Sequence, residues 1–240
     1  MTDPVKNRII IALDVDALGR ARDLVALLKN DVGSFKIGKQ LFTHYGPEAV
    51  HMVHDHGGKV FLDLKFHDIP TTVAKASLEA AHHGIFMFNM HALGGLEMMR
   101  RAADAVHRWA ADSGCPRPTI LAVTILTSMA DADLKLLGIA DTTQNLVIRL
   151  ALLAREAGLD GVVASPRETL PIRKACGSGF VIVTPGIRPA YAAKNDQKRS
   201  MTPAEALSQG SDYIVVGRPV TQAPDPLTAV QQLSAEIETC

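Results

Sequence analysis

The chain has 240 residues, 47% of them hydrophobic, and its 25 Lys and Arg residues balance its 25 Asp and Glu residues. This apolar content can supply a full hydrophobic core and excludes a disordered chain. Because the charges balance, there is no excess of positive charge that would indicate binding to nucleic acid. The N-terminus lacks the apolar region of a signal peptide and no apolar run is long enough to cross a bilayer, so we expect no membrane association.

Eight short apolar segments alternate with longer stretches along the chain. Each apolar segment is rich in β-branched residues and nearly continuously hydrophobic, which is typical of strands that are covered on both faces of a parallel sheet. The stretches between them, such as "ARDLVALLKN" and "NLVIRLALLAREAGL", have helical spacing. The expected strands span Arg8–Val15, Ser34–Lys39, Lys59–Phe66, Ile85–Ala92, Thr119–Leu126, Gly161–Pro166, Phe180–Ile187 and Tyr213–Val220.

This alternation predicts an α/β fold of the (β/α)₈ TIM-barrel type. Eight strand–helix units fit a chain close to the roughly 250 residues typical of such barrels, and a doubly wound open sheet is the alternative. No linker or shift in composition divides the sequence, so we expect one catalytic domain over residues 1–240.

Polar residues at the carboxyl ends of the expected strands are candidates for the active site, because this fold places its catalytic residues there. Most of these ends are otherwise apolar, so the polar side chains stand out. From the first strand to the fifth they are Asp14, Lys36, Asp63, Lys65, His91, Thr127 and Ser128.

The segment "KVFLDLKFHDIP" carries the strongest signal. Strand alternation places Asp63 and Lys65 on the same side, facing the barrel interior, and Lys36 on the neighbouring strand can reach the same volume. Asp68 follows in the turn before Pro70, whose ring suits the first turn of a helix. The alternatives are a buried ion-pair network and catalytic electrostatics, and we favour the second because such networks stabilise little. Nearby carboxylates favour the ammonium form of a lysine, which indicates a proton donor and argues against a Schiff base.

The ends of the last two strands predict an anion site. "TPGIRP" and "VVGRP" each combine a glycine with an arginine, Arg188 or Arg218, at the recurrent phosphate locus of these barrels. Either motif alone could be an ordinary turn, but the pair favours a phosphorylated ligand. The polar segment Ala190–Ser200 between them could be a lid over the phosphate or a disordered loop.

Histidine and cysteine patterns give little support for a metal. His51, His54 and His56 cluster before the third strand, away from the expected catalytic rim and without a recognised ligand spacing, so surface histidines are the better interpretation. Cys115, Cys176 and Cys240 form no CxxC pair and are odd in number, which suits a reducing cytoplasm.

Seven motifs extend over nearly the whole chain: "ALDVD" (12–16), "FKIG" (35–38), "FLDLKFHDIPTTV" (61–73), "LTS" (126–128), "VTPGIRP" (183–189), "DQ" (196–197) and "VVGRP" (215–219). Together they resemble the orotidine 5'-phosphate decarboxylase family of bacterial type. The DxKxxD element from Asp63 to Asp68 is shared with related phosphosugar decarboxylases, so the ensemble carries the resemblance. "MHALGG" at 90–95 is a modest departure from the expected "VHASGG" and affects only packing.

The resemblance implies the decarboxylation of orotidine 5'-phosphate to UMP and CO₂, the last step of de novo pyrimidine nucleotide synthesis, with neither metal nor organic cofactor. It implies a homodimer in which Asp68 and Thr72 reach the partner's site. Lys65 is then the proton donor, flanked by Asp63 and by the partner's Asp68. It also places Lys36 among the catalytic residues and implies that Lys36 and Asp14 contact the ribose and the charged network. Thr127 and Pro185 are further substrate contacts, and Arg188, Gln197, Gly217 and Arg218 hold the phosphate.

Two alternatives stay open from the sequence. A metal-dependent phosphosugar decarboxylase of the same superfamily tends to carry an acidic residue where this chain has Lys36, so this position argues against it. A non-catalytic barrel that only binds a phosphorylated ligand has no need for the buried pair of Asp63 and Lys65.

Overall fold

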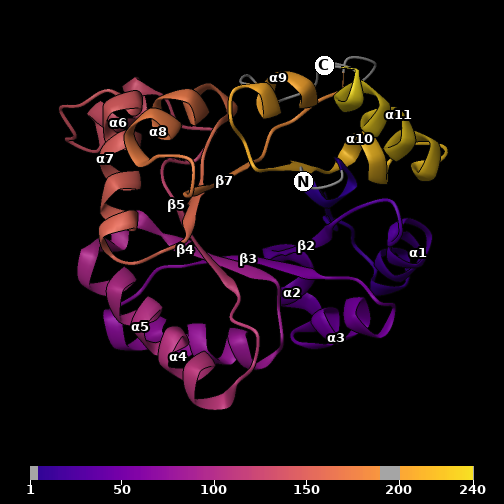
Figure 1. The fold of residues 1–240 in the computed structure, drawn as a ribbon, viewed down its shortest axis with the longest axis horizontal. Coiled ribbons are helices and arrows are strands. Elements are labelled where there is room, and N and C mark those ends of the chain that lie inside the picture. Colours follow the sequence, from indigo (N-terminus) through magenta and orange to yellow (C-terminus); the bar gives the residue numbers. More distant parts are fainter. Residues whose placement is uncertain (1–4, 190–200, 240) are drawn as a thin grey trace.

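Eight parallel strands close into a barrel in the order of the sequence in the computed structural model, which describes residues 5–189 and 201–239. Figure 1 shows helices surrounding these strands. Closure between the first and the last strand confirms the predicted (β/α)₈ barrel and excludes an open sheet. The strands are β1 (Ile9–Ala12), β2 (Ser34–Gly38), β3 (Val60–Phe66), β4 (Met87–His91), β5 (Thr119–Val123), β6 (Gly161–Val163), β7 (Val181–Thr184) and β8 (Tyr213–Val216).

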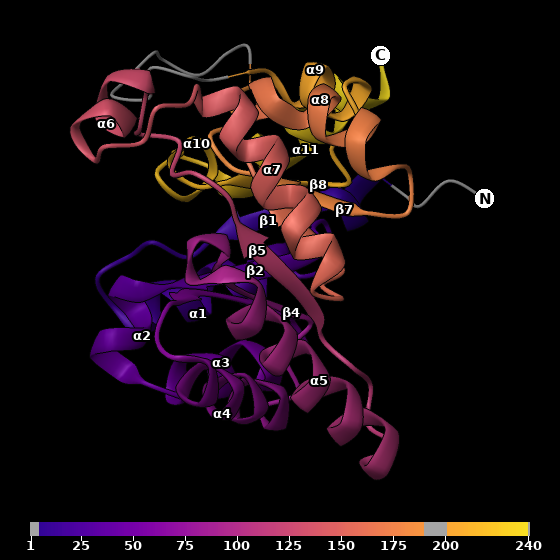
Figure 2. The same ribbon diagram turned by 90° about the vertical axis from the view of Figure 1, so that its left-hand side faces the viewer.

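At least one helix follows each strand, as the parallel topology requires. In Figure 2 the helices after β3 and β4 lie side by side below the strands. No helix within the described ranges has the length and apolar character needed to span a membrane. The α-helices are α1 (Leu18–Leu28), α2 (Lys39–Tyr45), α3 (Glu48–Asp55), α4 (Pro70–His82), α5 (Gly95–Ser113), α6 (Asp131–Leu136), α7 (Thr143–Glu156), α8 (Thr169–Cys176), α9 (Pro203–Ser208), α10 (Arg218–Thr221) and α11 (Pro226–Glu238), and short 3₁₀ helices are η1 (Val5–Arg8), η2 (Ala92–Gly94) and η3 (Pro166–Glu168).

Two apolar clusters form the core. The larger cluster fills the space between the strands and the helices, and a smaller one fills the barrel interior. Phe61, Met87 and Leu121 belong to the interior cluster and are at most 1% exposed. This packed interior excludes water from below, so that a polar site on the same axis can open only at the carboxyl ends of the strands.

Several strands end earlier than the sequence predicts. β1 ends at Ala12 instead of Val15, so Asp14 lies two residues beyond the strand and is exposed. β6 ends at Val163 instead of Pro166, because Pro166 begins η3. Proline suits the first position of a helix, where no backbone donor is required. Hydrophobic runs at these ends therefore continue into the loops that form the rim.

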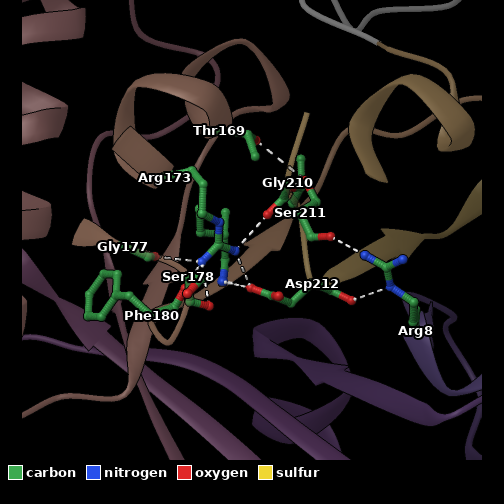
Figure 3. A network of polar contacts seen from close by, with 11 residues as sticks. Arg8, Thr169, Arg173, Gly177, Ser178, Phe180, Gly210, Ser211 and Asp212 are labelled. Atoms are coloured by element: carbon green, nitrogen blue, oxygen red, sulfur yellow. Dashed lines mark hydrogen bonds and ion pairs between the residues drawn. The ribbon is translucent and has the colours of Figure 1, made fainter. Parts of the chain in front are cut away.

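Arg173 of α8 ties together the amino-terminal ends of β7 and β8 (Figure 3). Its Nη1 donates to the carbonyl oxygens of Gly177, Ser178 and Phe180, at 2.7 to 3.0 Å. Its Nη2 lies 2.6 Å from the carbonyl oxygen of Gly210 and 2.6 Å from Oδ2 of Asp212. One planar guanidinium thus satisfies several backbone acceptors at the end of the barrel opposite the polar rim.

We expect Arg173→Lys to lower the free energy of unfolding by about 2 kcal/mol, because a single ammonium cannot reach both groups of carbonyl oxygens. In a chain of this size this corresponds to a fall in melting temperature of about 5 °C, measurable by calorimetry. Arg167→Lys is the matched control, since Arg167 is exposed and makes no such contacts. Equal melting temperatures for the two variants would contradict the assigned role of Arg173.

Candidate active site

Asp63 is the centre of a buried charge network inside the barrel. Its Oδ1 lies 2.6 Å from Nζ of Lys65, and its Oδ2 lies 3.3 Å from Nζ of Lys36. The same Lys36 ammonium lies 2.9 Å from Oδ1 of Asp14. Asn89 of β4 completes the set by donating from Nδ2 to Oδ1 of Asp63 at 2.7 Å. The predicted contacts among Asp14, Lys36, Asp63 and Lys65 are therefore present.

Lys36 and Asp63 hold their charges at neutral pH. Burial alone would lower the pKa of Lys36, but the carboxylates of Asp63 and Asp14 outweigh it and the pKa lies above its ordinary value. Burial likewise acts to raise the pKa of Asp63, and the charges of Lys36 and Lys65, with hydrogen bonds from Lys65 and Asn89, lower it instead. Protonating Asp63 would remove the partner of two lysines, so the ionised form is favoured over a wide pH range.

The backbone at Lys65 departs from regular strand geometry. Lys65 has a φ of +56°, and it is the one residue other than glycine with a positive φ in the described parts of the chain. The register between β3 and β4 shifts between Leu62 and Phe66. Simple alternation along the strand correctly predicts the contact between Asp63 and Lys65, but the regular strand on which that argument relied is wrong.

A cavity of about 170 Å³ opens above this network. Lys36, Asp63 and Lys65 line one side of it. Apolar residues of β5, β6 and β8, together with Thr127 and Pro185, form the other walls. The cavity thus has charged groups on one side and apolar side chains on the other. It lies at the carboxyl ends of the strands, where ligand sites in this fold occur.

The expected phosphate residues lie at the ends of two adjacent strands, β7 and β8. Gly186 has a φ of +80°, a left-handed conformation that favours glycine in this turn. Arg188 is buried, and its backbone N–H donates to the carbonyl oxygen of Met201 at 3.0 Å. Gly217 precedes α10, and Arg218 begins that helix at the surface. Gln197 and the whole segment 190–200, for which the sequence leaves open a lid or a disordered loop, lie outside the described residues.

Asp68 and Thr72 do not join the network within one chain. Both are exposed, and Asp68 Oδ1 accepts a hydrogen bond from the backbone N–H of Ile69 at 2.6 Å. Ile69 is itself 67% exposed. Among the described residues no ion pair connects Asp68 to Lys65.

The histidines do not form a metal site in residues 5–189 and 201–239, where no group of three His, Cys, Asp or Glu side chains is arranged to hold an ion. His91 lies at the rim with its ring centroid 5.5 Å from that of His67. Burial, and then the positive charges of His67, Lys39 and Lys65, lower the pKa of His91 to about 4. His91 is therefore neutral at physiological pH.

A larger cavity of about 410 Å³ lies at the amino-terminal end of the barrel. Trp109, Phe86 and Lys59 are among its lining residues, and no carboxylate belongs to that lining. His54 and His82 also line it, but it lies at the end of the barrel opposite to the one where this fold places its catalytic residues. The smaller cavity at the carboxyl ends of the strands is therefore the candidate active site.

The chain is similar over nearly its whole length to proteins of one family. The model of the orotidine 5'-phosphate decarboxylase / HUMPS family matches residues 7–233. The chain belongs to this family. It is 56% identical over 235 residues to orotidine 5'-phosphate decarboxylase of Pelobacter propionicus, covering 98% of this chain and 97% of the relative. The corresponding protein of Geobacter metallireducens is 55% identical over 235 residues, with 98% of each chain covered.

Solved structures of the family share the fold. The crystal structure of orotidine 5'-phosphate decarboxylase from Lactobacillus acidophilus superposes with a TM-score of 0.83 at 37% identity, covering 95% of this chain and 98% of the other. The enzyme from Pyrococcus horikoshii gives a TM-score of 0.74 at 25% identity, covering 96% of this chain and 99% of the other. The similarity extends along nearly the full length of each protein, so the barrel of this chain is the fold of the family.

Two residues to which the sequence analysis assigned no role of their own shape the site in this member of the family. Asn89 bridges β4 to Asp63 and Lys65, but in the sequence it is one polar residue in an apolar strand. Gly38 ends β2, and a Cβ added there would lie 2.9 Å from both Asp14 Oδ1 and Lys36 Nζ. The absence of a side chain at Gly38 therefore leaves the space in which Lys36 and Asp14 form their ion pair.

We expect Gly38→Ala to displace the Lys36 ammonium and to lower kcat/KM for the family substrate about tenfold, or about 1.4 kcal/mol, while the fold is kept. The φ of −92° at Gly38 is accessible to alanine, so backbone strain does not contribute. Gly19→Ala in α1 is the matched control, because nothing lies within 4 Å of a Cβ there. Unchanged kinetics in Gly38→Ala would mean that Lys36 does not need its observed position.

Proposed function

We propose that the protein decarboxylates orotidine 5'-phosphate to UMP and CO₂, the last step of de novo pyrimidine nucleotide synthesis. The observation that carries this proposal is the buried contact of Lys65 with Asp63, at 2.6 Å, inside a barrel of the orotidine 5'-phosphate decarboxylase / HUMPS family. A protonated lysine held by carboxylates can stabilise a developing negative charge and then donate a proton to it.

The proposed chemistry follows from the charges. Breaking the bond between C6 and the carboxylate of the substrate releases CO₂ and leaves the electron pair on C6. The ammonium of Lys65 stabilises this carbanion and delivers the proton that forms the C6–H bond of UMP. The lysine then regains a proton from solvent. In this proposal Asp63 keeps Lys65 charged and lies beside the substrate carboxylate, and neither metal nor organic cofactor takes part.

The remaining residues have binding roles in this proposal. Lys36 and Asp14 contact the ribose; support comes from Lys36, which lines the cavity, and from its ion pair with Asp14. Thr127 and Pro185 line the cavity at the pyrimidine. The phosphate binds at the ends of β7 and β8, where Arg188, Gly217 and Arg218 lie, with Gln197 as a further contact. Binding of this remote group can supply energy for positioning the ring.

A metal-dependent phosphosugar decarboxylase is the second candidate, because the family model covers more than one activity. In such an enzyme we expect carboxylates to converge on a divalent cation. Here the ammonium of Lys36 already lies between the two carboxylates, 2.9 Å from Asp14 and 3.3 Å from Asp63. This arrangement favours the reaction that needs no metal.

An absorbance assay with orotidine 5'-phosphate, with and without a chelator, tests the function. We expect turnover that a chelator does not change, and Lys65→Ala should lower kcat at least 1,000-fold, which is about 4 kcal/mol of transition-state stabilisation. Retention of a tenth of the wild-type kcat would remove Lys65 from the central role. The second candidate would be favoured if the wild-type protein did not turn over orotidine 5'-phosphate but decarboxylated a phosphosugar acid when a divalent metal ion was added.

We further propose a homodimer in which Asp68 and Thr72 complete the partner's site. Support comes from their exposure at the rim and from the exposed Ile69 between them, which offers apolar area for a contact. Among the described residues of one subunit, the recorded partner of the Asp68 carboxylate is the backbone N–H of Ile69. A twofold interface would place two such segments symmetrically.

Mixing two inactive variants tests the shared site. Lys65→Ala and Asp68→Ala should each be nearly inactive, and in their heterodimer one site combines an intact Lys65 with an intact Asp68. Random reassortment makes about half of the dimers mixed, each with one working site, so roughly a quarter of wild-type activity should return. If Asp68 served its own chain, every site would carry a lesion. If activity does not return after subunit exchange has been verified by mass spectrometry, the shared-site proposal is contradicted.

A further inference from the structure

Asn89 is a buried polar residue that contacts the backbone of Lys65 directly and the Lys65 ammonium through Asp63. It is 0% exposed, and it lies in β4 between Met87 and His91, on the strand face that lines the barrel interior. We infer that Asn89 is a positioning residue for the decarboxylation, which fixes the backbone of Lys65 and the carboxylate of Asp63 in the arrangement that the chemistry uses. This inference rests on the proposed function.

The first contact of Asn89 holds an unfavourable backbone. The backbone N–H of Lys65 donates to Asn89 Oδ1 at 2.8 Å, in the part of β3 where the register with β4 shifts. The left-handed φ of +56° at Lys65 is costly for a residue with a side chain and persists only where the surroundings impose it. The side chain of Asn89 thus takes the place of a ladder hydrogen bond and stabilises this conformation.

The second contact fixes the partner of the ammonium. Nδ2 of Asn89 donates to Asp63 Oδ1 at 2.7 Å, and the same oxygen lies 2.6 Å from Nζ of Lys65. A single amide therefore sets the origin of the lysine side chain and, through Asp63, the position of its end. An amide supplies one acceptor and one donor, which these two contacts require. Neither an aliphatic side chain nor an ionised carboxylate offers both.

The main test compares Asn89→Ala with Met87→Ala. We expect Asn89→Ala to lower kcat about 100-fold and to change KM less than threefold, because displacing a reacting group by about 1 Å costs that much while the ribose and phosphate contacts stay. Met87→Ala also removes a buried side chain from the barrel interior, two residues earlier on β4, and this apolar side chain makes no hydrogen bond or ion pair with the network among the described residues. It should keep kcat within threefold at a temperature well below its melting point.

A second variant tests the contact with Asp63 directly. In Asn89→Asp the introduced carboxyl can replace the amide only when it is protonated, since its ionised form cannot donate to Asp63. Its kcat relative to wild type should therefore fall as pH rises, by about tenfold between pH 5.5 and pH 8.5. On the neighbouring strand β5, the residue paired with position 89 is the apolar Leu121. The charged or titratable groups near this position are Asp14, Lys36, Asp63, Lys65, His67 and His91.

The outcomes separate this inference from the proposed function. Turnover by the wild-type protein establishes the function whatever the variants do. A kcat for Asn89→Ala within fivefold of wild type, or equal losses in Asn89→Ala and Met87→Ala, would overturn the positioning role. If Asn89→Ala fails to fold, judged by circular dichroism, Asn89→Asp decides: a ratio to wild type that does not vary with pH would overturn the inference.

Discussion

The ionised carboxylate of Asp63 is the interaction on which the site depends. It is 9% exposed, yet it receives two ammonium groups and one amide N–H, and these contacts offset the cost of burying a charge. The network of Asp14, Lys36, Asp63 and Lys65 contains two positive and two negative charges, so it is neutral within one chain. Removal of Asp63 would leave Lys36 and Lys65 as neighbouring cations without a common partner.

The barrel provides the conditions for this network. Its interior below the charges is closed by apolar residues such as Phe61 and Met87, so the ion pairs lie in a medium where their electrostatic effect is strong. Rigidity at the opposite end comes from arginine contacts with backbone carbonyls, of which Arg173 makes several. The arginine contacts with backbone carbonyls and the candidate active site thus lie at opposite ends of the barrel.

Sequence patterns predicted the barrel and the charged members of the site, because strand periodicity and the position of charges at strand ends are local properties. They did not predict Asn89, whose role arises from a pairing between β3 and β4 that no spacing encodes. Gly38 was missed for a related reason, since its importance lies in the Lys36 and Asp14 atoms that occupy the adjacent space. The positive φ of Lys65 also lies beyond propensity rules, which place lysine in ordinary regions of backbone conformation.

The proposed dimer changes the charge balance of the site in a direction that suits the reaction. Within one chain the network is neutral, and the partner's Asp68 would make it negative before substrate binds. In this proposal the substrate carboxylate then enters a negatively charged region, which repels it. The protein's contacts with the ribose and the phosphate keep the substrate bound. In the proposed reaction, breaking the C6–carboxylate bond releases neutral CO₂ and leaves the negative charge as an electron pair on C6, next to the ammonium of Lys65. Attraction thus increases along the reaction, which is the requirement for lowering its barrier rather than only binding the substrate.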